Sequence, residues 1–280
     1  MVQITDLHFS YRKKSVFTGL DLSFQSGYIY GLLGKNGTGK STLLHNICGL
    51  LFPDSGKIDV LGFMPEERRP AFLQKLFIIP EEFYLPDVPI RKFIRCNGPF
   101  YPKYNHQQFE GYLKEFDIPS NTTIQRMSYG QKKKLLISFA LACNTDLLLM
   151  DEPTNGLDIM SKSQFRKVLA GAINENKCIV VSTHQVKDLE ALIDYITVID
   201  EGKILFNQSI NEILDKLTFK LSFDAADLEE AIYSEPSLTG NATILRNKEN
   251  ETGQIDLELL YKAVITNGRG VRDIFNAEMA

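Results

Sequence analysis

The chain has 280 residues, of which 44% are hydrophobic and 24% are charged. These values are typical of a folded protein with one large domain or two unequal domains, and they exclude a largely disordered chain. The formal net charge of -4 gives no general attraction to polyanions, so we expect no nucleic-acid partner.

The sequence predicts a protein that neither spans nor enters the membrane. Its first residues lack the apolar core of a signal peptide, and the longest apolar run, residues 135–143, is too short to cross a bilayer. The cysteines lie far apart and form no CxxC pair, which predicts reduced core residues of a cytoplasmic protein without a disulfide or metal role. They are Cys48, Cys96, Cys143 and Cys178.

Short apolar runs alternate with helix-length segments over the first 200 residues or so. Partial alternation at 2–9 and 20–26 is typical of half-exposed, antiparallel strands, whereas the continuous apolar run at 28–34 is typical of a buried strand. A helix is expected from Gly39 to about Cys48. Further buried strands are predicted at 77–80, 147–150, 178–182 and 195–199. This alternation predicts an α/β domain with a mostly parallel sheet.

The strand pattern is absent between Glu81 and Cys143. Helices are predicted there at about 90–95, 107–116 and 129–142. We therefore expect a helical subdomain, at about 82–143, inserted into a sheet domain of residues 1–217.

A different pattern begins after Leu217. It predicts strands at 219–224, 241–246 and 254–258, and helices at 225–234 and 259–264. Because this segment is too short for a large core and carries no catalytic motif, we expect residues 218–280 to form a small appended α+β domain.

A glycine-rich loop joins the strand at 28–34 to the helix after it. It fits the pattern G-x-x-x-x-G-K-[ST] in the strand–loop–helix context that this motif requires. Backbone N–H groups of such a loop converge on phosphate oxygens, and the helix N-terminus adds a positive dipole end. We expect Lys40 to reach the β- and γ-phosphates and the Ser41 hydroxyl to ligate Mg²⁺. The loop residues are Gly34, Lys35, Asn36, Gly37, Thr38, Gly39, Lys40 and Ser41, followed by Thr42.

Two carboxylates, Asp151 and Glu152, end the apolar strand at 147–150. Alternation along a strand directs them to different sides, so they can take different tasks. We expect Asp151 to hold Mg²⁺, through water, and Glu152 to polarise the water that attacks the γ-phosphate.

The segment MDEPTNGLD (150–158) resembles the second nucleotide motif and the D-loop of ATP-binding cassette (ABC) proteins. The resemblance extends over residues 1 to about 210, and the motifs follow the family's order. Ser128-Tyr129-Gly130-Gln131 is similar to the signature motif, and His184 in VSTHQ matches the switch histidine that senses the γ-phosphate. Tyr11 stands where the family places an aromatic residue that stacks on adenine, although Phe9 and Phe17 are nearby alternatives.

The resemblance implies an ATP- and Mg²⁺-dependent ATPase with an active site shared between two chains. In the family, the helix that starts at the signature motif binds the γ-phosphate held by the other subunit, and the D-loop, ending here at Asp158, belongs to the same nucleotide-binding set. An anion at that helix start would also suit Lys132, Lys133 and Lys134 in its first turns, although a solvated basic face fits these lysines equally well.

The implied partners are a second nucleotide-binding subunit, identical or different, and a separate integral-membrane permease. The protein would then lie on the cytoplasmic face of the membrane, and the segment FYLPDVPIRKF (83–93) is the expected docking surface. The resemblance implies an ATP-binding subunit of a drug-efflux exporter, although import remains an alternative. The alternatives are a soluble ABC ATPase, for example in iron–sulfur assembly, and a non-catalytic regulatory cassette, which the presence of Lys40, Glu152 and His184 disfavours.

Two residues depart from the family's pattern. Glu81 stands where the family usually has a glutamine that contacts Mg²⁺, and a carboxylate there can ligate Mg²⁺ but adds negative charge beside the triphosphate. Tyr129 replaces a common glycine of the signature. Since Ser128, Gly130 and Gln131 remain, we expect anion binding to survive and the neighbouring surface to change.

Overall fold

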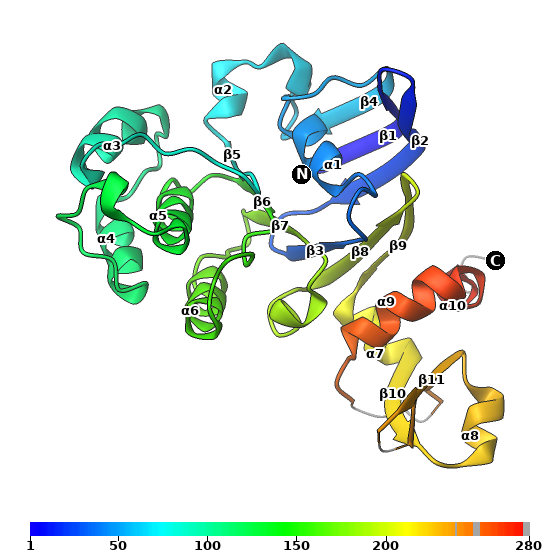
Figure 1. The fold of residues 1–280 in the computed structure, drawn as a ribbon. Helices are drawn as coiled ribbons and strands as arrows, with labels where there is room; N and C mark the ends of the chain where they lie inside the picture. Colours follow the sequence, from blue (N-terminus) through cyan, green and yellow to red (C-terminus); the bar gives the residue numbers. More distant parts are fainter. Residues whose placement is uncertain (239, 249–252, 277–280) are drawn as a thin grey trace.

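A six-stranded sheet forms the centre of the protein (Figure 1), of which the computed structural model describes residues 1–238, 240–248 and 253–276. All neighbouring strands are parallel except the last pair. This confirms the α/β class, although the antiparallel edge strand was not predicted. The strand order is β5 (Leu76–Ile79), β6 (Leu147–Asp151), β7 (Cys178–Thr183), β3 (Ile29–Leu33), β8 (Tyr195–Asp200) and β9 (Lys203–Ser209).

The parallel strands are buried on both faces, because successive side chains point to opposite sides of a sheet. Leu148 and Met150 of β6 belong to one core, and Leu147 and Leu149 belong to the other. The first core contains residues of α5 (Tyr129–Ala142) and α6 (Ile159–Ala170). The second lies between the central sheet, α1 (Lys40–Ile47) and an antiparallel sheet of β2 (Lys14–Phe24), β1 (Val2–Tyr11) and β4 (Ser55–Val60). The antiparallel N-terminal strands were predicted, whereas β4 was missed.

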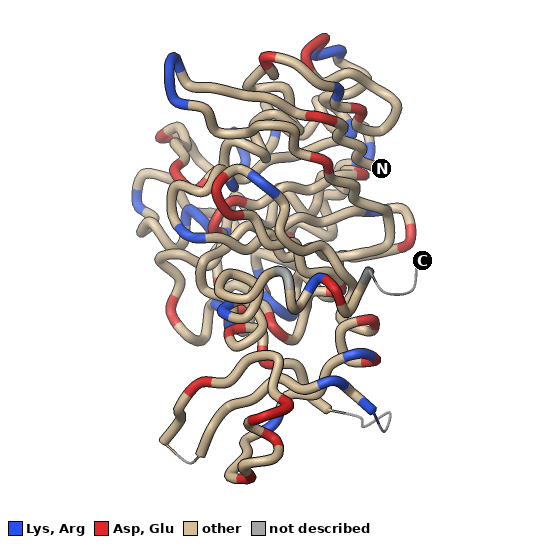
Figure 2. Tube along the Cα trace, turned by 90° about the vertical axis from the view of Figure 1, so that its right-hand side faces the viewer, with Lys and Arg blue, Asp and Glu red and all other residues tan. Residues whose placement is uncertain are grey.

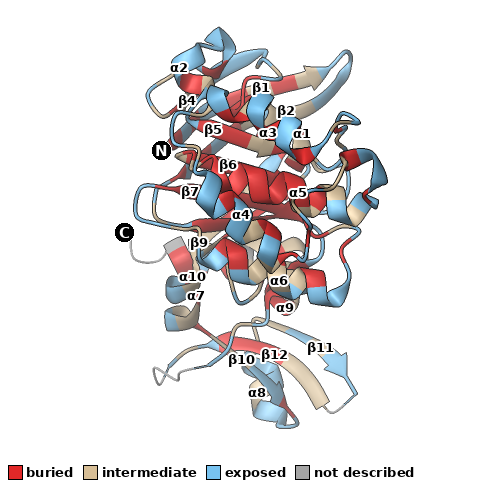
Figure 3. Cartoon of the chain, turned by 90° about the vertical axis from the view of Figure 1, so that its left-hand side faces the viewer, coloured by how far each residue is buried: buried red, intermediate tan, exposed pale blue. Residues whose placement is uncertain are grey.

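Helices fill the segment between β5 and β6, and the only strand-like pairing there is an isolated bridge between Pro89 and Thr123. Figure 3 shows α5 buried between α4 and the strands. Its bounds are the predicted ones, because the Ser128 cap and its capping box with Gln131 start the helix ahead of the apolar run that begins at Leu135. The helices are α3 (Ile90–Asn97), η2 (Gly98–Phe100), α4 (His106–Glu115), η3 (Ile124–Arg126) and α5, and η1 (Pro65–Glu67) and α2 (Pro70–Leu73) precede β5.

The C-terminal part is an antiparallel sheet with strand order β10-β12-β11, covered by helices. The strand predicted at 254–258 is wrong, because Asp256 caps a helix there by accepting a hydrogen bond from the Leu259 amide at 2.9 Å. The helix predicted at 225–234 ends at Glu230, and the missed strand β11 tolerates Pro236 because it is an edge strand. The elements are α7 (Ile210–Lys216), β10 (Leu217–Ser222), α8 (Ala225–Glu230), β11 (Tyr233–Ser237), β12 (Gly240–Arg246), α9 (Leu257–Thr266) and α10 (Gly268–Asn276).

This C-terminal part shares its apolar core with the central sheet. Ile244 of β12, Leu260 of α9 and Ile274 of α10 belong to the same cluster as Val198 of β8 and Phe206 of β9. Parts of the extension expected at 218–280, namely residues 239, 249–252 and 277–280, lie outside the described residues. Helices α9 and α10 therefore pack on the sheet that carries the glycine-rich loop.

The surface and the cysteines add three observations. No helix in the described ranges is long and apolar enough to span a membrane. Lys and Arg are interspersed with Asp and Glu in the view of Figure 2. All four cysteines are free, and three are buried as expected, but Cys96 on α3 is exposed and is therefore not a core residue.

The aromatic centre of the helical segment predicts a stability effect. Phe139 is 2% exposed and packs against Phe77 and Phe93 with ring centroids 5.8 and 5.2 Å away. We expect Phe139→Ala to lower the free energy of unfolding by about 3–5 kcal/mol because it leaves a cavity. Phe100→Ala, at a residue that is 67% exposed, should change it by at most about 0.5 kcal/mol. Urea unfolding followed by circular dichroism measures both, and equal effects would contradict this packing.

Candidate nucleotide-binding site

The candidate site lies where β3, β6 and β7 end. Leu33 pairs with Thr183, and Asp151 pairs with Ser182, so these parallel strands end at one edge of the sheet. Ligands of open α/β sheets bind at this edge. The sheet register thereby brings the glycine-rich loop, the two carboxylates and the segment with His184 together, as the motifs predicted.

The glycine-rich loop folds tightly over its own lysine. Gly39 caps α1 with a φ of 107°, a value that a side chain strongly disfavours. The buried Lys40 ammonium donates to the carbonyl oxygens of Gly34 at 2.7 Å and Lys35 at 3.1 Å, and it lies 3.7 Å from Glu152 Oε1. Burial lowers the pKa of Lys40, and the Glu152 and then the Asp151 carboxylates oppose that shift. The ammonium is therefore held at the centre of the site.

A cavity of about 550 Å³ opens beside this loop, within the range of ligand pockets. Tyr11 lies on its wall, 48% exposed, with its hydroxyl 3.4 Å from Thr42 Oγ1. Phe9 and Phe17 are buried, so of these three aromatic residues Tyr11 is the one that faces the cavity. The lining residues are Tyr11, Lys14, Ser15, Val16, Asn36, Gly37, Thr38, Gly39, Lys40, Ser41, Thr42, Glu81, Glu152, Glu201 and Gly202.

The two carboxylates are both buried but have different partners. Asp151 accepts a hydrogen bond from the Ser182 hydroxyl. Glu152 Oε1 lies 2.8 Å from His184 Nδ1, whereas its Oε2 is buried without a hydrogen-bond partner in the described chain. A buried carboxylate oxygen of this kind requires a donor, and a water molecule can provide it. Glu152 lies past the end of β6, so its direction comes from the following turn and not from strand alternation.

Glu81 and Tyr129, the two departures from the family's pattern, contact each other. The Tyr129 hydroxyl donates to the Glu81 carbonyl oxygen at 3.0 Å, and its ring stacks on Phe83 at 5.3 Å. The Glu81 carboxylate accepts a hydrogen bond from Asn155 Nδ2 at 3.3 Å and lines the cavity. Tyr129 thus joins the signature motif to the segment after β5 within one chain.

The signature residues and Asp158 do not line the cavity of their own chain. Ser128 and Gln131 form a capping box in which the Ser128 hydroxyl oxygen accepts from the Gln131 amide at 3.2 Å. Gly130 follows in the first turn of α5. Asp158 caps α6 through the Ser161 amide at 2.7 Å, and this hydrogen bond lowers the pKa of Asp158.

The solvated basic face suggested for the signature helix is wrong for Lys133. This lysine is fully buried, and its ammonium donates to the carbonyl oxygens of Glu152 at 2.7 Å and Asn155 at 3.0 Å.

Sequence reasoning also missed Ser182, although its position in VSTHQ, two residues before His184, was a usable signal. Nothing in the sequence marked Val16 or Glu201 as cavity residues.

The residues present are suited to a Mg²⁺ ion that is shared with phosphate. In the described part of the chain, no group of three or more His, Cys, Asp or Glu side chains is arranged to hold a metal alone. Ser41 and Glu81 line the cavity, and Asp151 is buried next to it. Mg²⁺ in phosphate-transfer sites takes one or two protein oxygens and completes its shell with phosphate and water, which this set allows.

Comparison with known proteins identifies the family. Residues 17–155 match the model of the ABC transporter family. The chain is 30% identical to the Nod factor export ATP-binding protein I of Rhizobium etli over 224 residues, which cover 77% of this chain and 70% of that protein. The chain belongs to the ATP-binding cassette transporter family. It is therefore an ATP-binding subunit with ATPase activity that is coupled to transport.

A further relative and a solved structure agree with this family assignment. The chain is 28% identical to the bacitracin transport ATP-binding protein BcrA of Bacillus licheniformis over 237 residues, covering 83% of this chain and 77% of that protein. A solved ATP-binding subunit of an ABC transporter has the same fold, with a TM-score of 0.69 at 23% identity, covering 76% of this chain and 91% of that one. These relatives give no support to the soluble iron–sulfur alternative.

The position of Glu81 predicts a change in the Mg²⁺ requirement. We expect Glu81→Ala to raise the half-saturating Mg²⁺ concentration for hydrolysis by about tenfold or more. Glu81→Gln should change it by about threefold or less, because an amide oxygen also ligates hard cations. Glu82→Ala, at the next residue and outside the cavity lining, is the matched control. An unchanged Mg²⁺ dependence in Glu81→Ala would assign this residue to the permease interface instead.

Proposed function

We propose that this protein drives export by a separate integral-membrane permease, as one of two ATP-binding subunits on the cytoplasmic face of the membrane. The observation that carries the hydrolytic part of this proposal is the buried Glu152 carboxylate between Lys40 and His184, with one oxygen left for water. The named functions of relatives support export, since they include bacitracin transport, Nod factor export and linearmycin resistance.

In this proposal each residue of the site has a separate task. Lys40 and the loop amides bind the β- and γ-phosphates, and Tyr11 stacks on adenine. Ser41, Asp151 and Glu81 hold Mg²⁺, which neutralises phosphate charge when bound. Glu152 takes up the proton of the attacking water through its free oxygen, and His184 holds the carboxylate and senses the γ-phosphate.

The pair of subunits would share each nucleotide. Ser128, Gly130 and Gln131 are absent from the cavity lining of their own chain, and Ser128 is exposed at the start of the 14-residue helix α5. A helix N-terminus favours an anion. We infer that this helix start, together with the D-loop residue Asp158, meets the γ-phosphate held by the other subunit, so that ATP closes the dimer and hydrolysis releases it.

We further propose two functional parts. Residues 1–217 would form the nucleotide-binding domain, in which the helical subdomain at about 82–143 passes the motion to the permease. Tyr84, 83% exposed after β5, supports docking of the permease at 83–93. Residues 218–280 would form an extension that tunes rate or assembly without taking part in the chemistry.

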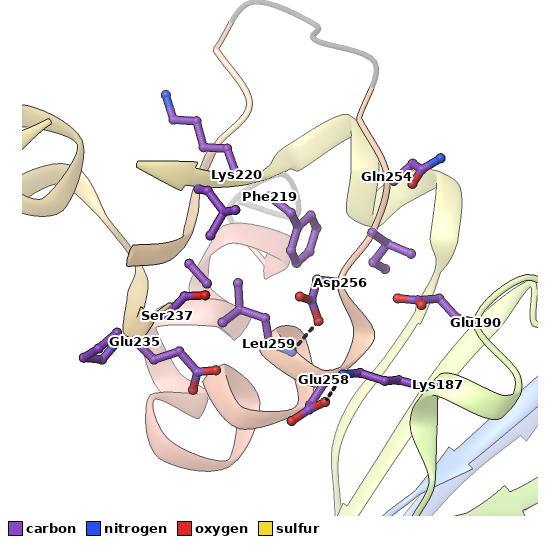
Figure 4. Close-up of a pocket in the computed structure, with 14 residues that line it drawn as sticks. Lys187, Glu190, Phe219, Lys220, Glu235, Ser237, Gln254, Asp256, Glu258 and Leu259 are labelled. Atoms are coloured by element: carbon purple, nitrogen blue, oxygen red, sulfur yellow. Dashed lines mark hydrogen bonds and ion pairs between the residues drawn. The ribbon is translucent and has the colours of Figure 1, made fainter. Parts of the chain in front are cut away.

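The extension reaches the switch segment after His184, which supports the tuning role. Figure 4 shows the junction, where Lys187 forms an ion pair with Glu258 of α9 at 2.9 Å. The Leu257 amide donates to the Glu190 carboxylate at 3.1 Å, next to η4 (Val186–Asp188). Burial and then the charge of Asp200 raise the pKa of Tyr261, as expected if α9 lies against the end of β8. Movement of the switch segment and of α9 would therefore be coupled.

The first prediction for this proposal concerns the extension. Glu258→Gln removes the charge that pairs with Lys187 and Lys262 and leaves the shared apolar core intact. We expect hydrolysis at saturating ATP to stay within about threefold of wild type, because exposed ion pairs contribute little. Glu229→Gln on α8 is the control. A steady-state ATPase assay decides, and loss of hydrolysis with unchanged nucleotide binding would contradict a role of the extension that is limited to tuning.

The second prediction concerns Glu152. Glu152→Gln should remove most hydrolysis, by about 100-fold or more, and leave ATP binding intact, because the amide cannot accept the proton of water. Light scattering after size-exclusion chromatography should then show more dimer with ATP than without it. Adding Ser128→Arg should abolish the shift by blocking the shared phosphate. Wild-type turnover in the Glu152→Gln protein would overturn the catalytic assignment.

A further inference from the structure

The backbone at Glu152 has an unusual conformation. The φ angle of Glu152 is 45°, in the left-handed region, and Pro153 is the next residue. This region costs a residue with a side chain about 1–2 kcal/mol, and a following proline restricts the backbone further. Such conformations persist at functional sites only when the surrounding contacts fix them.

Hydrogen bonds fix the backbone of Glu152 at both its amide and its carbonyl group. Towards β7, the Glu152 amide donates to the Ser182 carbonyl oxygen at 3.1 Å and lies 3.3 Å from the Ser182 hydroxyl. Towards α5, the Glu152 carbonyl oxygen accepts from Lys133 Nζ at 2.7 Å. Lys133 also donates to the Asn155 carbonyl oxygen at 3.0 Å. One ammonium therefore holds both Glu152 and Asn155, the first and last residues of the turn that contains Pro153.

Burial of Lys133 requires compensation, since its side chain is fully enclosed. The two carbonyl oxygens and the nearby carboxylates of Glu81, Glu152 and Asp151 provide it, and the Tyr129 ring lies 5.9 Å from the ammonium. Burial nevertheless lowers the pKa of Lys133. The residue does not line the cavity, so it acts on nucleotide only through other groups.

We propose that Lys133 is a positioning residue: it fixes the direction of the Glu152 side chain by holding the peptide behind it, and it joins this turn to the signature helix of the same chain. The inference rests on the proposed role of Glu152 in activating water. Lys133 lies five residues after Ser128 on the same helix. If the start of α5 moves when it contacts the nucleotide of the partner subunit, the Lys133 side chain would transmit that movement to Glu152 of its own chain.

Steady-state kinetics of the full-length protein tests this role. Lys133→Met and Lys133→Gln leave the two carbonyl oxygens without the ammonium, and we expect kcat to fall by about tenfold or more while the KM for ATP changes by about twofold or less. Lys133→Arg restores charged donors and should have a higher kcat than either. Lys134→Met is the matched control, because Lys134 contacts Phe116 and Gln164 instead, and its kcat should stay within about twofold of wild type.

A double-mutant cycle separates positioning from a general loss of structure. In the Glu152→Gln background, Lys133→Gln should lower the residual single-turnover rate by about twofold or less, because the carboxylate that it positions is gone. A multiplicative loss in that background, or a folded Lys133→Gln protein with wild-type kcat, would overturn the inference while leaving Glu152 as the base. Wild-type turnover of Glu152→Gln would overturn the proposed function itself.

Discussion

Opposite charges buried at the carboxyl edge of the central sheet set the arrangement of the whole site. Asp151 and Glu152 are 2% and 3% exposed, and Lys40 and Lys133 are 6% and 0% exposed. Buried charges are tolerated only when they are paired and hydrogen-bonded. The glycine-rich loop and the signature helix each contribute one of these lysines, so both are fixed relative to the end of β6.

The same constraint links segments that are distant in sequence. Asn155, after the carboxylates, donates to Glu81 after β5, and Tyr129 of the signature motif donates to the carbonyl oxygen of Glu81. Lys133 completes this network by holding the Glu152 and Asn155 carbonyl oxygens. Phe83, the first residue of the proposed permease-docking segment, also stacks on Tyr129, so this segment, the signature helix and the proposed catalytic turn meet within one chain. Discrete packing contacts of this kind are a physical means by which motion at one site biases another.

Much of this arrangement follows from the sequence because it is local. The glycine-rich loop, the buried strands and the cap of α5 are each determined by neighbouring residues, and the parallel sheet then brings the strand ends together. The C-terminal part was harder to predict because its short elements carry weak periodicity. A cap at Asp256 and an edge strand with Pro236 determine it instead. Lys133 could not be found from the sequence, since its partners are backbone oxygens that no pattern marks.

The central claim is that two chains enclose each nucleotide between Lys40 of one and the Ser128 helix start of the other. A crystal structure of the Glu152→Gln protein with ATP and Mg²⁺ tests it most directly. The account predicts a two-fold pair with each γ-phosphate in contact with Lys40 of one protomer and Ser128 of its partner. A nucleotide bound to one chain alone, with Ser128 directed to solvent in a monomer or in a differently arranged dimer, would contradict it.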